Sequence, residues 1–437
     1  MNEQQIHSEP NMEKPLTEHI KKDGTSLSLE EYEKVGGYQA LRKALMLKPE
    51  EVVKTIKDSG LKGRGGAGFS TGTKWSLVPV GEHVPSPTYF IANADEMEPG
   101  SFKDRFLLEG NPHQLIEGII IGAYAVQASI SFVFLRWAYH KAARAIKIAI
   151  QEAYAAGYLG KNILGSEFHL EMSLHISVGR YMCGEETALL NALEGKRANP
   201  RTKPPHPVVS GLFGKPTIVN NVETLSNVPH IINKGADWFM KLGKTDEGGT
   251  KLYGASGRVK NPGLWELPLG TSLRELLEVH AGGMQDGYKF KGVLPGGGST
   301  DFLTAEHLDV PMDYKSVSKI GSRLGTGTII VLDDKTCPVG MVRNLEHFFA
   351  QESCGWCTPC REGLPWTAKI LDAIETGKGK MEDLDTLIFH THYMAPGNTF
   401  CALAPGAMEP LQSALKYFKE DFKKHINEQH CPWNNNG

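Results

Sequence analysis

The sequence lacks any apolar run long enough to cross a membrane. The longest nearly apolar stretch, residues 115–128, contains Glu117 and Gln127 and is shorter than the about 20 residues that a membrane-spanning helix needs. Residues 1–23 are polar and lack the apolar core of a signal peptide. These absences predict a cytoplasmic protein with no direct membrane span, or the soluble part of a larger assembly.

An excess of charge of either sign is also missing. The 47 basic and 50 acidic side chains leave a formal net charge of -3, whereas nucleic-acid-binding proteins normally show a basic excess. Nucleic acid is therefore not an expected partner. The chain also has no repeat of about 20 to 50 residues, which excludes solenoids and propellers. Its lack of G-x-S-x-G, H-E-x-x-H and P-loop motifs argues against hydrolases and NTPases.

Cysteine is scarce and unevenly placed, whereas glycine is plentiful. Three of the seven cysteines, Cys354, Cys357 and Cys360, lie close together. In a cytosolic chain this indicates metal or redox chemistry rather than disulfides. The 48 glycines are clustered rather than periodic, which excludes collagen and favours loops that bring the backbone close to a ligand.

The predicted elements divide the chain into four parts. Residues 1–60 are an arm, loose to about residue 30, followed by two helices. Residues 61–245 alternate strand and helix, which predicts an α/β fold with a doubly wound, mainly parallel sheet. Residues 246–335 are β-rich with one helix at 272–280 and form a small α+β domain. Residues 336–437 form a helical bundle, with helices expected at 342–351, 366–375, 383–392 and 410–425.

The first candidate site is the glycine-rich segment 63–68. It matches the dinucleotide fingerprint G-x-G-x-x-G, but a predicted helix rather than a strand precedes it, so it is not a strict Rossmann motif. Successive glycines still allow backbone amides to converge on an anion or a flat ring, and Arg64 and Lys74 add positive charge for a phosphate. A flexible hinge is the alternative. The interleaved basic residues favour a ligand-binding loop.

Acidic clusters follow two predicted strands. Asp95, Glu96 and Glu98 follow a strand at 88–92, and Glu185 and Glu186 follow a strand at 169–178. Ligands of open α/β sheets bind beyond the carboxyl ends of strands, where carboxylates commonly contact the ribose of NAD. The alternatives are a solvated turn and stabilisation of a helix N-terminus. Two such clusters in one sheet favour a shared nucleotide site.

Two further segments add weaker signals to this site. The basic loop 196–203 can neutralise a pyrophosphate, although it can equally be a solvated run of charge. The segment 220–224 adds amide and hydroxyl groups that can donate hydrogen bonds to a ligand.

The cysteine motif gives the strongest signal. Cys354, Cys357 and Cys360 have the spacing C-x2-C-x2-C, and with the remote Cys401 they match the ligands of a [4Fe–4S] cluster. A thioredoxin-like redox pair is one alternative, but that motif belongs near a βαβ unit. A four-thiolate zinc site is the other, but such sites usually use two paired C-x2-C modules. Cys183, Cys337 and Cys431 have no partner spacing and are expected to be plain thiols.

A nucleotide site beside an iron–sulfur cluster presents a mismatch in electron number. NADH gives up a hydride, which carries two electrons, whereas the cluster accepts one. A flavin handles both kinds of transfer. The residues therefore predict NAD, a flavin and an iron–sulfur cluster in one protein.

Six segments resemble the family of NADH-binding flavoprotein subunits of respiratory complex I. They are GRGGAGF (63–69), NADEMEPGSFKDR (93–105), GRYMCGEETALLNALEGKRANPR (179–201), GKPTIVNNVETL (214–225), SCGWCTPCREG (353–363) and FCALAPGA (400–407). The resemblance covers nearly the whole chain beyond the arm. It implies a Rossmann-like FMN- and NADH-binding domain at 61–245, a ubiquitin-like β-grasp (SLBB-like) domain at 246–335 and a helical bundle with a [4Fe–4S] cluster at 336–437.

The resemblance also implies roles for individual residues. The expected FMN contacts are Gly63, Arg64, Gly65, Gly66, Lys74, Asn93, Asp95, Tyr181, Gly184, Asn220, Asn221 and Thr224. Glu96 and Glu185 are expected beside the isoalloxazine and nicotinamide rings, as the catalytic residues. Glu98 and Glu186 are expected to contact the nicotinamide nucleotide, with Glu186 disfavouring NADPH. Phe69 is expected to stack on the adenine near Lys203, and the cluster ligands are Cys354, Cys357, Cys360 and Cys401. Leu77 and His206 replace aromatic residues of some relatives, so the adenine contacts differ there.

The implied function is a subunit of a quinone-reducing translocase. A hydride passes from NADH to FMN, and electrons then pass singly to the cluster and toward quinone. The implied partners are a thioredoxin-like [2Fe–2S] subunit, a large iron–sulfur subunit and the rest of complex I, on the cytoplasmic side of the membrane. The diaphorase subunit of an NAD-linked hydrogenase or formate dehydrogenase is an alternative in the same family. An alternative of another class is a zinc-stapled nucleotide-binding scaffold, which predicts zinc without iron or flavin.

Overall fold

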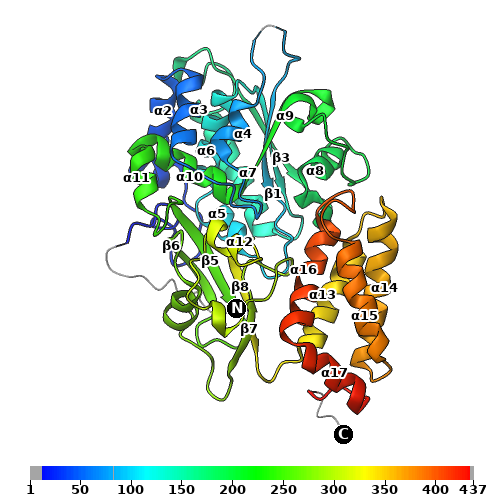
Figure 1. Cartoon of the computed structure of the whole chain (residues 1–437). Helices are drawn as coiled ribbons and strands as arrows, with labels where there is room; N and C mark the ends of the chain where they lie inside the picture. The colour runs from blue at the N-terminus through cyan, green and yellow to red at the C-terminus, as the bar shows by residue number, and fades with distance from the viewer. Residues whose placement is uncertain (1–11, 82, 434–437) are drawn as a thin grey trace.

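The structure is a computed structural model that describes residues 12–81 and 83–433 (Figure 1). Its first sheet has four parallel strands in the order β3-β2-β1-β4. These strands are β1 (Tyr89–Ala94), β2 (Ile130–Leu135), β3 (Glu171–Ile176) and β4 (Thr217–Asn221). The predicted α/β fold with a parallel sheet is confirmed.

Side chains alternate between two apolar layers along each strand. In β1, Phe90 and Ala92 enter one core and Tyr89 and Ile91 enter the other. The first core contains buried residues of α1 (Leu29–Lys34), α2 (Gln39–Leu45), α3 (Pro49–Asp58), α4 (Thr71–Ser76), α5 (Lys103–Gly110), α6 (Pro112–Ala125), α7 (His140–Ala155), α10 (Val222–Lys234) and α11 (Ala236–Lys241). Helix α8 (Glu186–Leu193) covers the second, and α9 (Pro207–Ser210) lies beside β4.

The N-terminal segment is packed rather than loose from residue 12 onward. Leu16 and Ile20 are buried in the first core. The backbone amides of Leu16 and Thr17 donate to the carboxylate of Glu266 in the second domain. The expectation of a loose arm is therefore wrong for residues 12–28, and its first eleven residues lie outside the described chain. Helices α1 to α3 share their core with the sheet domain.

The second sheet is mixed and has the strand order β6-β5-β8-β7. Its strands are β5 (Thr250–Ser256), β6 (Gly263–Pro268), β7 (Phe290–Leu294) and β8 (Thr328–Asp333), with β5 and β8 parallel. The predicted helix at 272–280 is a π-helical turn, Glu275–His280, and α12 (Tyr314–Lys319) follows later. The predicted small α+β domain is therefore present.

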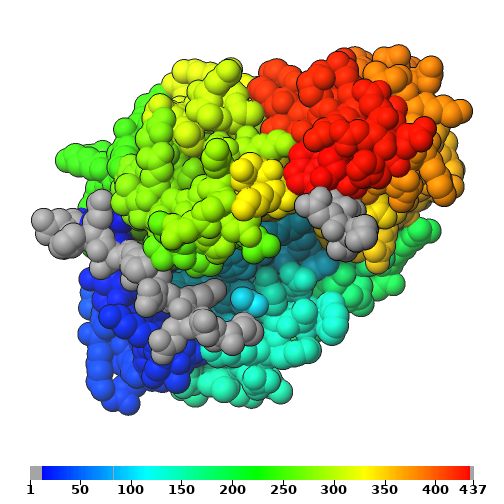
Figure 2. All heavy atoms as spheres, turned by 90° about the horizontal axis from the view of Figure 1, so that it is seen from below, coloured from blue at the N-terminus to red at the C-terminus, as the bar shows by residue number. Residues whose placement is uncertain are grey.

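Five helices form the C-terminal bundle. They are α13 (Pro338–Glu352), α14 (Thr358–Glu375), α15 (Met381–Tyr393), α16 (Leu403–Tyr417) and α17 (Lys419–Glu428). The single helix predicted at 410–425 is wrong, because the chain leaves helical geometry at Phe418 and begins a new helix. The bundle lies beside the second domain (Figure 2). Among the helices described, none is long and apolar enough to cross a membrane.

Candidate functional site

The order of the parallel strands gives a topological switch point between β1 and β4. The chain runs from β1 outward to β2 and β3, then returns to β4 on the other side of β1. Open α/β sheets bind ligands at such a switch point, beyond the carboxyl ends of the strands. Asn93 lies at this end of β1, and Asn220 and Asn221 end β4. We call this region the switch-point site, formed by residues 63–66, 93–95 and 220–224.

The glycine-rich loop, residues 63–68, contacts the end of β4 and the first turn of α10. The backbone N–H of Arg64 donates to Thr224 Oγ1 at 2.8 Å. A Cβ atom placed on Gly65 would lie 3.1 Å from the Cβ of Asn221. The loop therefore lies directly against the N-terminus of α10, where Asn221 accepts hydrogen bonds from Glu223 and Thr224.

Tyr314 packs against one side of the glycine-rich loop, whereas space remains beside Gly184. The hydroxyl of Tyr314 donates to Gly63 O at 2.8 Å, and a Cβ on Gly68, which has φ +68°, would lie 2.5 Å from the Tyr314 ring. A Cβ on Gly184, across the site, would have no described heavy atom within 4 Å. Asn93 Nδ2 lies 3.5 Å from Gly184 O. The backbone at Gly184 thus borders free space beside β1, as a planar cofactor requires.

The side chain of Arg64 turns away from the loop. Its Nη2 donates to Gly248 O at 3.2 Å and to Thr250 O at 3.1 Å, at the start of β5. Its Nε and Nη1 atoms are buried without a hydrogen-bond partner in the described chain. The guanidinium of Arg64 therefore points toward the start of β5, whereas the sequence predicts that its charge contacts a phosphate at the loop.

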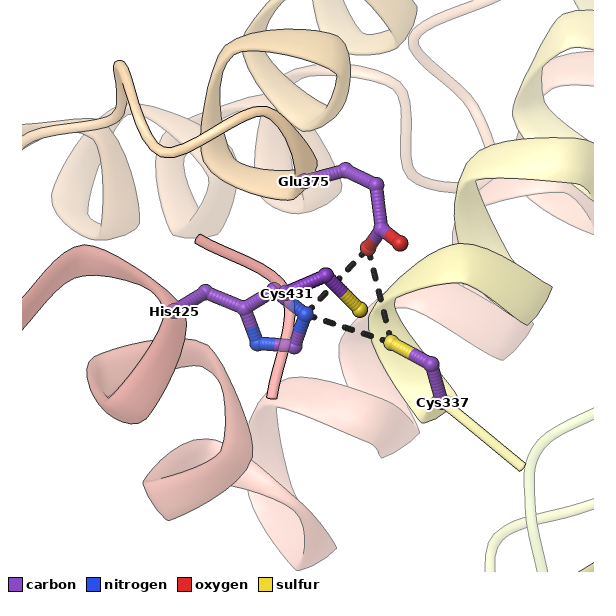
Figure 3. Close-up of side chains that lie close together, drawn as sticks. All are labelled: Cys337, Glu375, His425 and Cys431. Atoms are coloured by element: carbon purple, nitrogen blue, oxygen red, sulfur yellow. Dashed lines mark hydrogen bonds and ion pairs between the residues drawn. The ribbon is translucent and has the colours of Figure 1, made fainter. Parts of the chain in front are cut away.

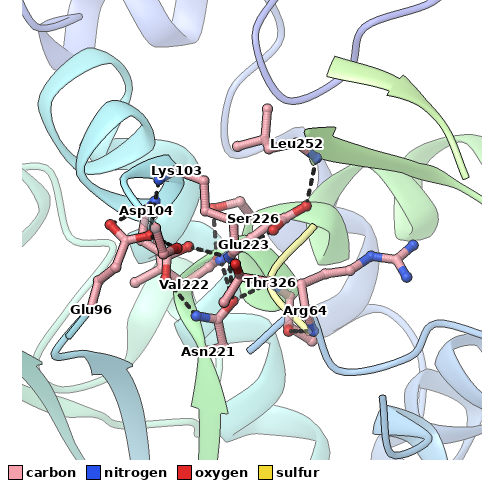
Figure 4. A network of polar contacts seen from close by, with 12 residues as sticks. Arg64, Glu96, Lys103, Asp104, Asn221, Val222, Glu223, Ser226, Leu252 and Thr326 are labelled. Atoms are coloured by element: carbon pink, nitrogen blue, oxygen red, sulfur yellow. Dashed lines mark hydrogen bonds and ion pairs between the residues drawn. The ribbon is translucent and has the colours of Figure 1, made fainter. Parts of the chain in front are cut away.

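A buried network of charged side chains, which the sequence did not predict, lies next to Asn221 of the switch-point site (Figure 4). Lys103 Nζ lies 2.7 Å from Asp104 Oδ1 and 2.7 Å from Glu223 Oε2, and Lys251 lies 3.3 Å from Glu223. Burial opposes the charge of Lys103, but the carboxylates of Asp104 and Glu223 hold its pKa above the usual value. Lys103 Nζ also lies 3.5 Å from Asn221 Oδ1, so this paired lysine helps to fix the Asn221 side chain at the end of β4.

The carboxylate of Glu96, which is expected beside the flavin and nicotinamide rings, is held by hydrogen bonds from the chain itself. Its carboxylate accepts from Ser101 Oγ, Tyr139 OH and the backbone N–H groups of residues 103–105, the first turn of α5. A carboxylate in this place stabilises the helix N-terminus. Both oxygens are thus engaged by the protein itself.

Of the other two carboxylates after β1, Asp95 is buried beside Ser177 and Glu98 is half-buried beside Tyr181. Ser177 Oγ donates to Asp95 Oδ2 at 2.7 Å, while Asp95 Oδ1 is buried and unpaired among the described residues. Burial raises the pKa of Asp95 to about 6. Glu98 accepts from Tyr181 OH and from the Ser299 backbone N–H, each at 2.7 Å, so it joins the first domain to the second. Burial also raises the pKa of Glu98, against these hydrogen bonds.

The acidic pair at the start of α8 lies beside two lysines. Glu186 Oε2 is 2.6 Å from Lys74 Nζ, and Lys203 Nζ is 2.9 Å from Glu185 Oε1 and 3.5 Å from Glu186 Oε1. Burial opposes ionisation of Glu186, but Lys74 and Lys203 keep its pKa below the usual value. Glu185 also accepts from the backbone N–H groups of Thr187 and Ala188 and so caps α8. The structure therefore brings together residues from three separate predicted segments.

Exposed apolar side chains lie close in sequence to the glycine-rich loop 63–68. Phe69 and Leu77 are each 55% exposed, and His206 is exposed on another segment. Trp75, in helix α4 between Phe69 and Leu77, is buried and donates from Nε1 to Asn220 Oδ1 at 2.8 Å. An aromatic face left in solvent, such as that of Phe69, is suited to stacking on a base.

The four predicted cluster cysteines come together at one end of the bundle. Cys354 and Cys357 lie between α13 and α14, Cys360 is in the first turn of α14, and Cys401 precedes α16. All four border the same apolar core. Burial and the neighbouring thiols of the other three raise the pKa of Cys360 to about 12. Cysteine thiolates are the usual ligands of iron–sulfur clusters, so this set of four sulfur donors fits such a cluster.

The cluster cysteines and the acidic pair approach each other across the domain boundary. After burial, Cys354 and Glu185 are the main groups that raise the pKa of Cys401, to about 11. Arg197 Nη2, which follows α8, donates to Cys354 O at 2.6 Å. The start of α8 therefore lies between the switch-point site and the cysteines.

Family models match three segments of the chain. The Nuo51 FMN-binding domain matches residues 56–230, the SLBB domain matches residues 255–302, and the NADH-ubiquinone oxidoreductase-F iron-sulfur binding region matches residues 340–425. The three matches fall on the three structural domains in order.

Similar proteins of known identity cover almost the whole chain. The F subunits of the NADH-quinone oxidoreductases of Salmonella typhimurium and Escherichia coli are each 57% identical over 415 residues, which are 95% of this chain and 93% of theirs. A solved NAD+-reducing [NiFe]-hydrogenase in the H2-reduced state has a TM-score of 0.81 at 34% identity, covering 94% of this chain and 67% of that one. The chain belongs to the family of NADH-quinone oxidoreductase F subunits, the NADH-binding flavoprotein subunits of complex I.

Proposed function

We propose that the switch-point site holds FMN between the glycine-rich loop and Gly184. The free space beside Gly184 and the unpaired Asp95 Oδ1 fit a planar group that donates a hydrogen bond. Asn93, Tyr181, Asn220, Asn221 and Thr224 supply polar groups around it. Lys74 and the backbone N–H groups of Gly65 and Gly66 supply positive potential for its phosphate. A bound flavin would supply the change from hydride to single-electron transfer.

NADH is placed by the acidic residues that surround this space. Glu186 stays ionised beside Lys74 and Lys203 and is suited to the hydroxyls of a ribose, as are carboxylates of other NAD sites. Glu98 accepts a hydrogen bond from Tyr181, three residues before Gly184. Glu185, the residue after Gly184, caps α8. Glu96 supports the nicotinamide region indirectly, through the position of α5. Phe69, with Lys203 nearby, contacts the adenine. No side chain needs to move a proton in hydride transfer, so these residues act by position and charge.

The observation that carries this proposal is the position of α8. Its first-turn carboxylate pairs with Lys74 of the loop-bearing segment, and the preceding residue, Glu185, lies near Cys401. One helix terminus thus connects the nucleotide side with the cysteines at 354, 357, 360 and 401, which would hold the [4Fe–4S] cluster. Electrons that leave the nucleotide side therefore have a short path to the cluster.

The similarity to F subunits supports specific partners and a location. We infer that the electrons pass on to a thioredoxin-like [2Fe–2S] subunit of the E type and to a large iron–sulfur subunit of the G type. The chain would then sit on the cytoplasmic face of the membrane, held there through the complex. A second candidate, the diaphorase part of an NAD-linked hydrogenase, is favoured by the structural neighbour at 34% identity. The 57% identity to F subunits favours the complex I assignment.

An anaerobic NADH titration of the chain, purified with its neighbouring subunit, tests the proposal. Flavin bleaching with loss of iron–sulfur absorbance is expected. Cys357→Ala should lose the iron but still bleach its flavin with NADH, because the two sites use separate residues. A folded Cys357→Ala protein with unreactive flavin contradicts this separation of roles. Co-purification with hydrogenase subunits instead of E- and G-type subunits would favour the second candidate.

A further inference from the structure

Four potential metal ligands that the function above does not use meet at the far end of the bundle (Figure 3). They are Cys337 before α13, Glu375 at the end of α14, His425 in α17 and Cys431 in the C-terminal tail. One donor atom from each lies within 4.8 Å of all the others. We propose that these four side chains bind one Zn²⁺ ion, at a site separate from the iron–sulfur cysteines.

The distances between the donor atoms match a tetrahedral zinc site. Cys337 Sγ lies 3.2 Å from His425 Nε2 and 3.4 Å from Glu375 Oε2, and His425 Nε2 lies 3.3 Å from the same Glu375 oxygen. With bonds of about 2.0 to 2.3 Å, the edges of a zinc tetrahedron are roughly 3.3 to 3.8 Å long. The three donor atoms are thus already spaced as the edges of one tetrahedron, with Cys431 as the fourth corner.

His425 is oriented as a metal ligand. Its Nδ1 lies 2.7 Å from the backbone oxygen of Asp421. A carbonyl oxygen can only accept, so Nδ1 carries a proton and Nε2 is the ring nitrogen that faces the other three residues. A metal-binding histidine is commonly fixed in this way by a backbone carbonyl. The ring is fully buried, and Trp433 stacks on it with an interplanar angle of 17°.

The two thiols also lie in suitable surroundings. Cys337 is the N-cap of α13, and its sulfur accepts from the Gly340 backbone N–H at 3.2 Å, which helps to fix the position of Sγ among the other three donors. Gly377, with φ +73°, allows the tail to approach, since a Cβ there would lie 1.8 Å from Gln429 O. Thiolate, imidazole and carboxylate together suit Zn²⁺, whereas magnesium and calcium prefer oxygen ligands alone.

The site would have a structural role. Its ligands come from four segments, α13, α14, α17 and the tail, so one ion would fasten the end of the chain to the start of the bundle. Helix α14 begins beside the cluster cysteines and ends at Glu375, which separates the two sites by roughly 27 Å of helix. Zinc has no redox chemistry, so the ion would not take part in electron transfer. Protein side chains supply all four ligands, as in closed structural sites.

Metal analysis of the full chain, purified with its partner subunit, tests the proposal without any variant. We expect one zinc per chain in addition to the iron. X-ray absorption at the zinc edge should give two sulfur neighbours at about 2.3 Å and two nitrogen or oxygen neighbours at about 2.0 Å. Absence of zinc after expression in zinc-supplied medium overturns the proposal, as does a Cys337–Cys431 disulfide in the native protein.

Variants then locate the ion. Cys431→Ser and His425→Gln should lose the zinc and keep the iron and the flavin. Cys183→Ser, which removes another buried thiol, is the matched control and should keep the zinc. Cys357→Ser should show the reverse pattern, with iron lost and zinc kept. Zinc that stays in Cys431→Ser but leaves with Cys357→Ser would be an ion in the cluster site and would contradict the proposal.

Discussion

At the residue scale, Gly184 allows cofactor binding to be separated from folding. Its φ is not positive and a Cβ there meets no described atom within 4 Å, so Ala is compatible with the folded backbone. If FMN occupies the space beside it, the added methyl group would collide with the flavin.

We therefore expect Gly184→Ala to leave the free energy of unfolding of the FMN-free chain within about 0.5 kcal/mol of wild type. Its affinity for FMN should fall by at least about tenfold. Flavin fluorescence quenching and thermal unfolding measure the two quantities. Wild-type FMN affinity in this variant would place the flavin elsewhere.

Glu186 supplies a second prediction at this scale. Its carboxylate, held ionised by Lys74 and Lys203, would repel the additional phosphate of NADPH. Glu186→Gln removes this repulsion and leaves both lysines to attract the phosphate. We expect kcat/KM for NADPH relative to NADH to rise about tenfold, less at high salt. Glu420→Gln, an equal change of charge on exposed α17, should not alter the ratio.

Single residues at strand ends were predictable because the carboxyl ends of parallel strands share one edge. This reasoning predicts Asn93, Asp95 and Glu186 around one site, and the structure brings Asn93 Nδ2 within 3.5 Å of Gly184 O, two residues before Glu186. The same reasoning could not orient Glu96 or Arg64. Their side-chain directions depend on where α5 and β5 begin, and the motif does not specify that.

At the scale of elements, Glu266 of β6 anchors the N-terminal segment. Its carboxylate accepts from Leu16 N, Thr17 N, Thr17 Oγ1 and Thr250 Oγ1. Burial nevertheless raises its pKa from 4.5 to about 7. The folded state therefore binds a proton that the unfolded state releases between these two values, so the contribution of Glu266 to stability is lost as pH rises from 4.5 to 7.

We expect the opening free energy of the Leu16 and Thr17 amides, measured by hydrogen exchange and corrected for intrinsic rates, to fall across this range. The loss should reach about 3 kcal/mol, at roughly 1.4 kcal/mol per pKa unit. In Glu266→Gln, which does not titrate, the opening free energy should be independent of pH there. Parallel curves for the two proteins would show that Glu266 is not the titrating group.

Long periodic elements were predictable, and short or interrupted ones were not. Helices α13 and α15 contain their expected ranges, 342–351 and 383–392. Strand β4 is five residues long and ends in two asparagines, so neither its length nor its composition marked it as a strand. The break between α16 and α17 occurs at buried Phe418, whose apolar character continues the helical pattern and hides the change of direction.

At the scale of the whole molecule, the sites depend on contacts between residues far apart in the chain. Cys337 and Cys431 have no motif spacing and were expected to be plain thiols. Their meeting requires α13, α14 and α17 to fold against one another first. The charge network of Lys103, Glu223 and Lys251 likewise crosses from the first domain to the second. Sequence spacing indicates only local geometry, so it could not predict either the proposed zinc ligands or this charge network.

The contact between the first domain and the bundle sets the distance from the nucleotide side to the cluster cysteines. Glu352, the last residue of α13, accepts from the Tyr181 backbone N–H at 2.9 Å and lies 3.3 Å from Arg180 Nε. Arg180 also donates to Gln351 O at 3.0 Å. These contacts fasten the segment before α8 to the helix that leads into Cys354.

Glu352→Ala removes the acceptor of both contacts and should let the two domains separate slightly. Because electron transfer rates fall steeply with distance, we expect reduction of the cluster to slow by about an order of magnitude or more. Flavin reduction by NADH should slow far less, because the Tyr181 hydroxyl beside the proposed flavin stays bonded to Glu98. Anaerobic stopped-flow absorbance resolves the two steps. Glu352→Gln, which keeps an acceptor for Tyr181 N–H, should retain most of the second rate. Equal slowing of both steps would mean that Glu352 acts on the nucleotide site and not on the docking of the bundle.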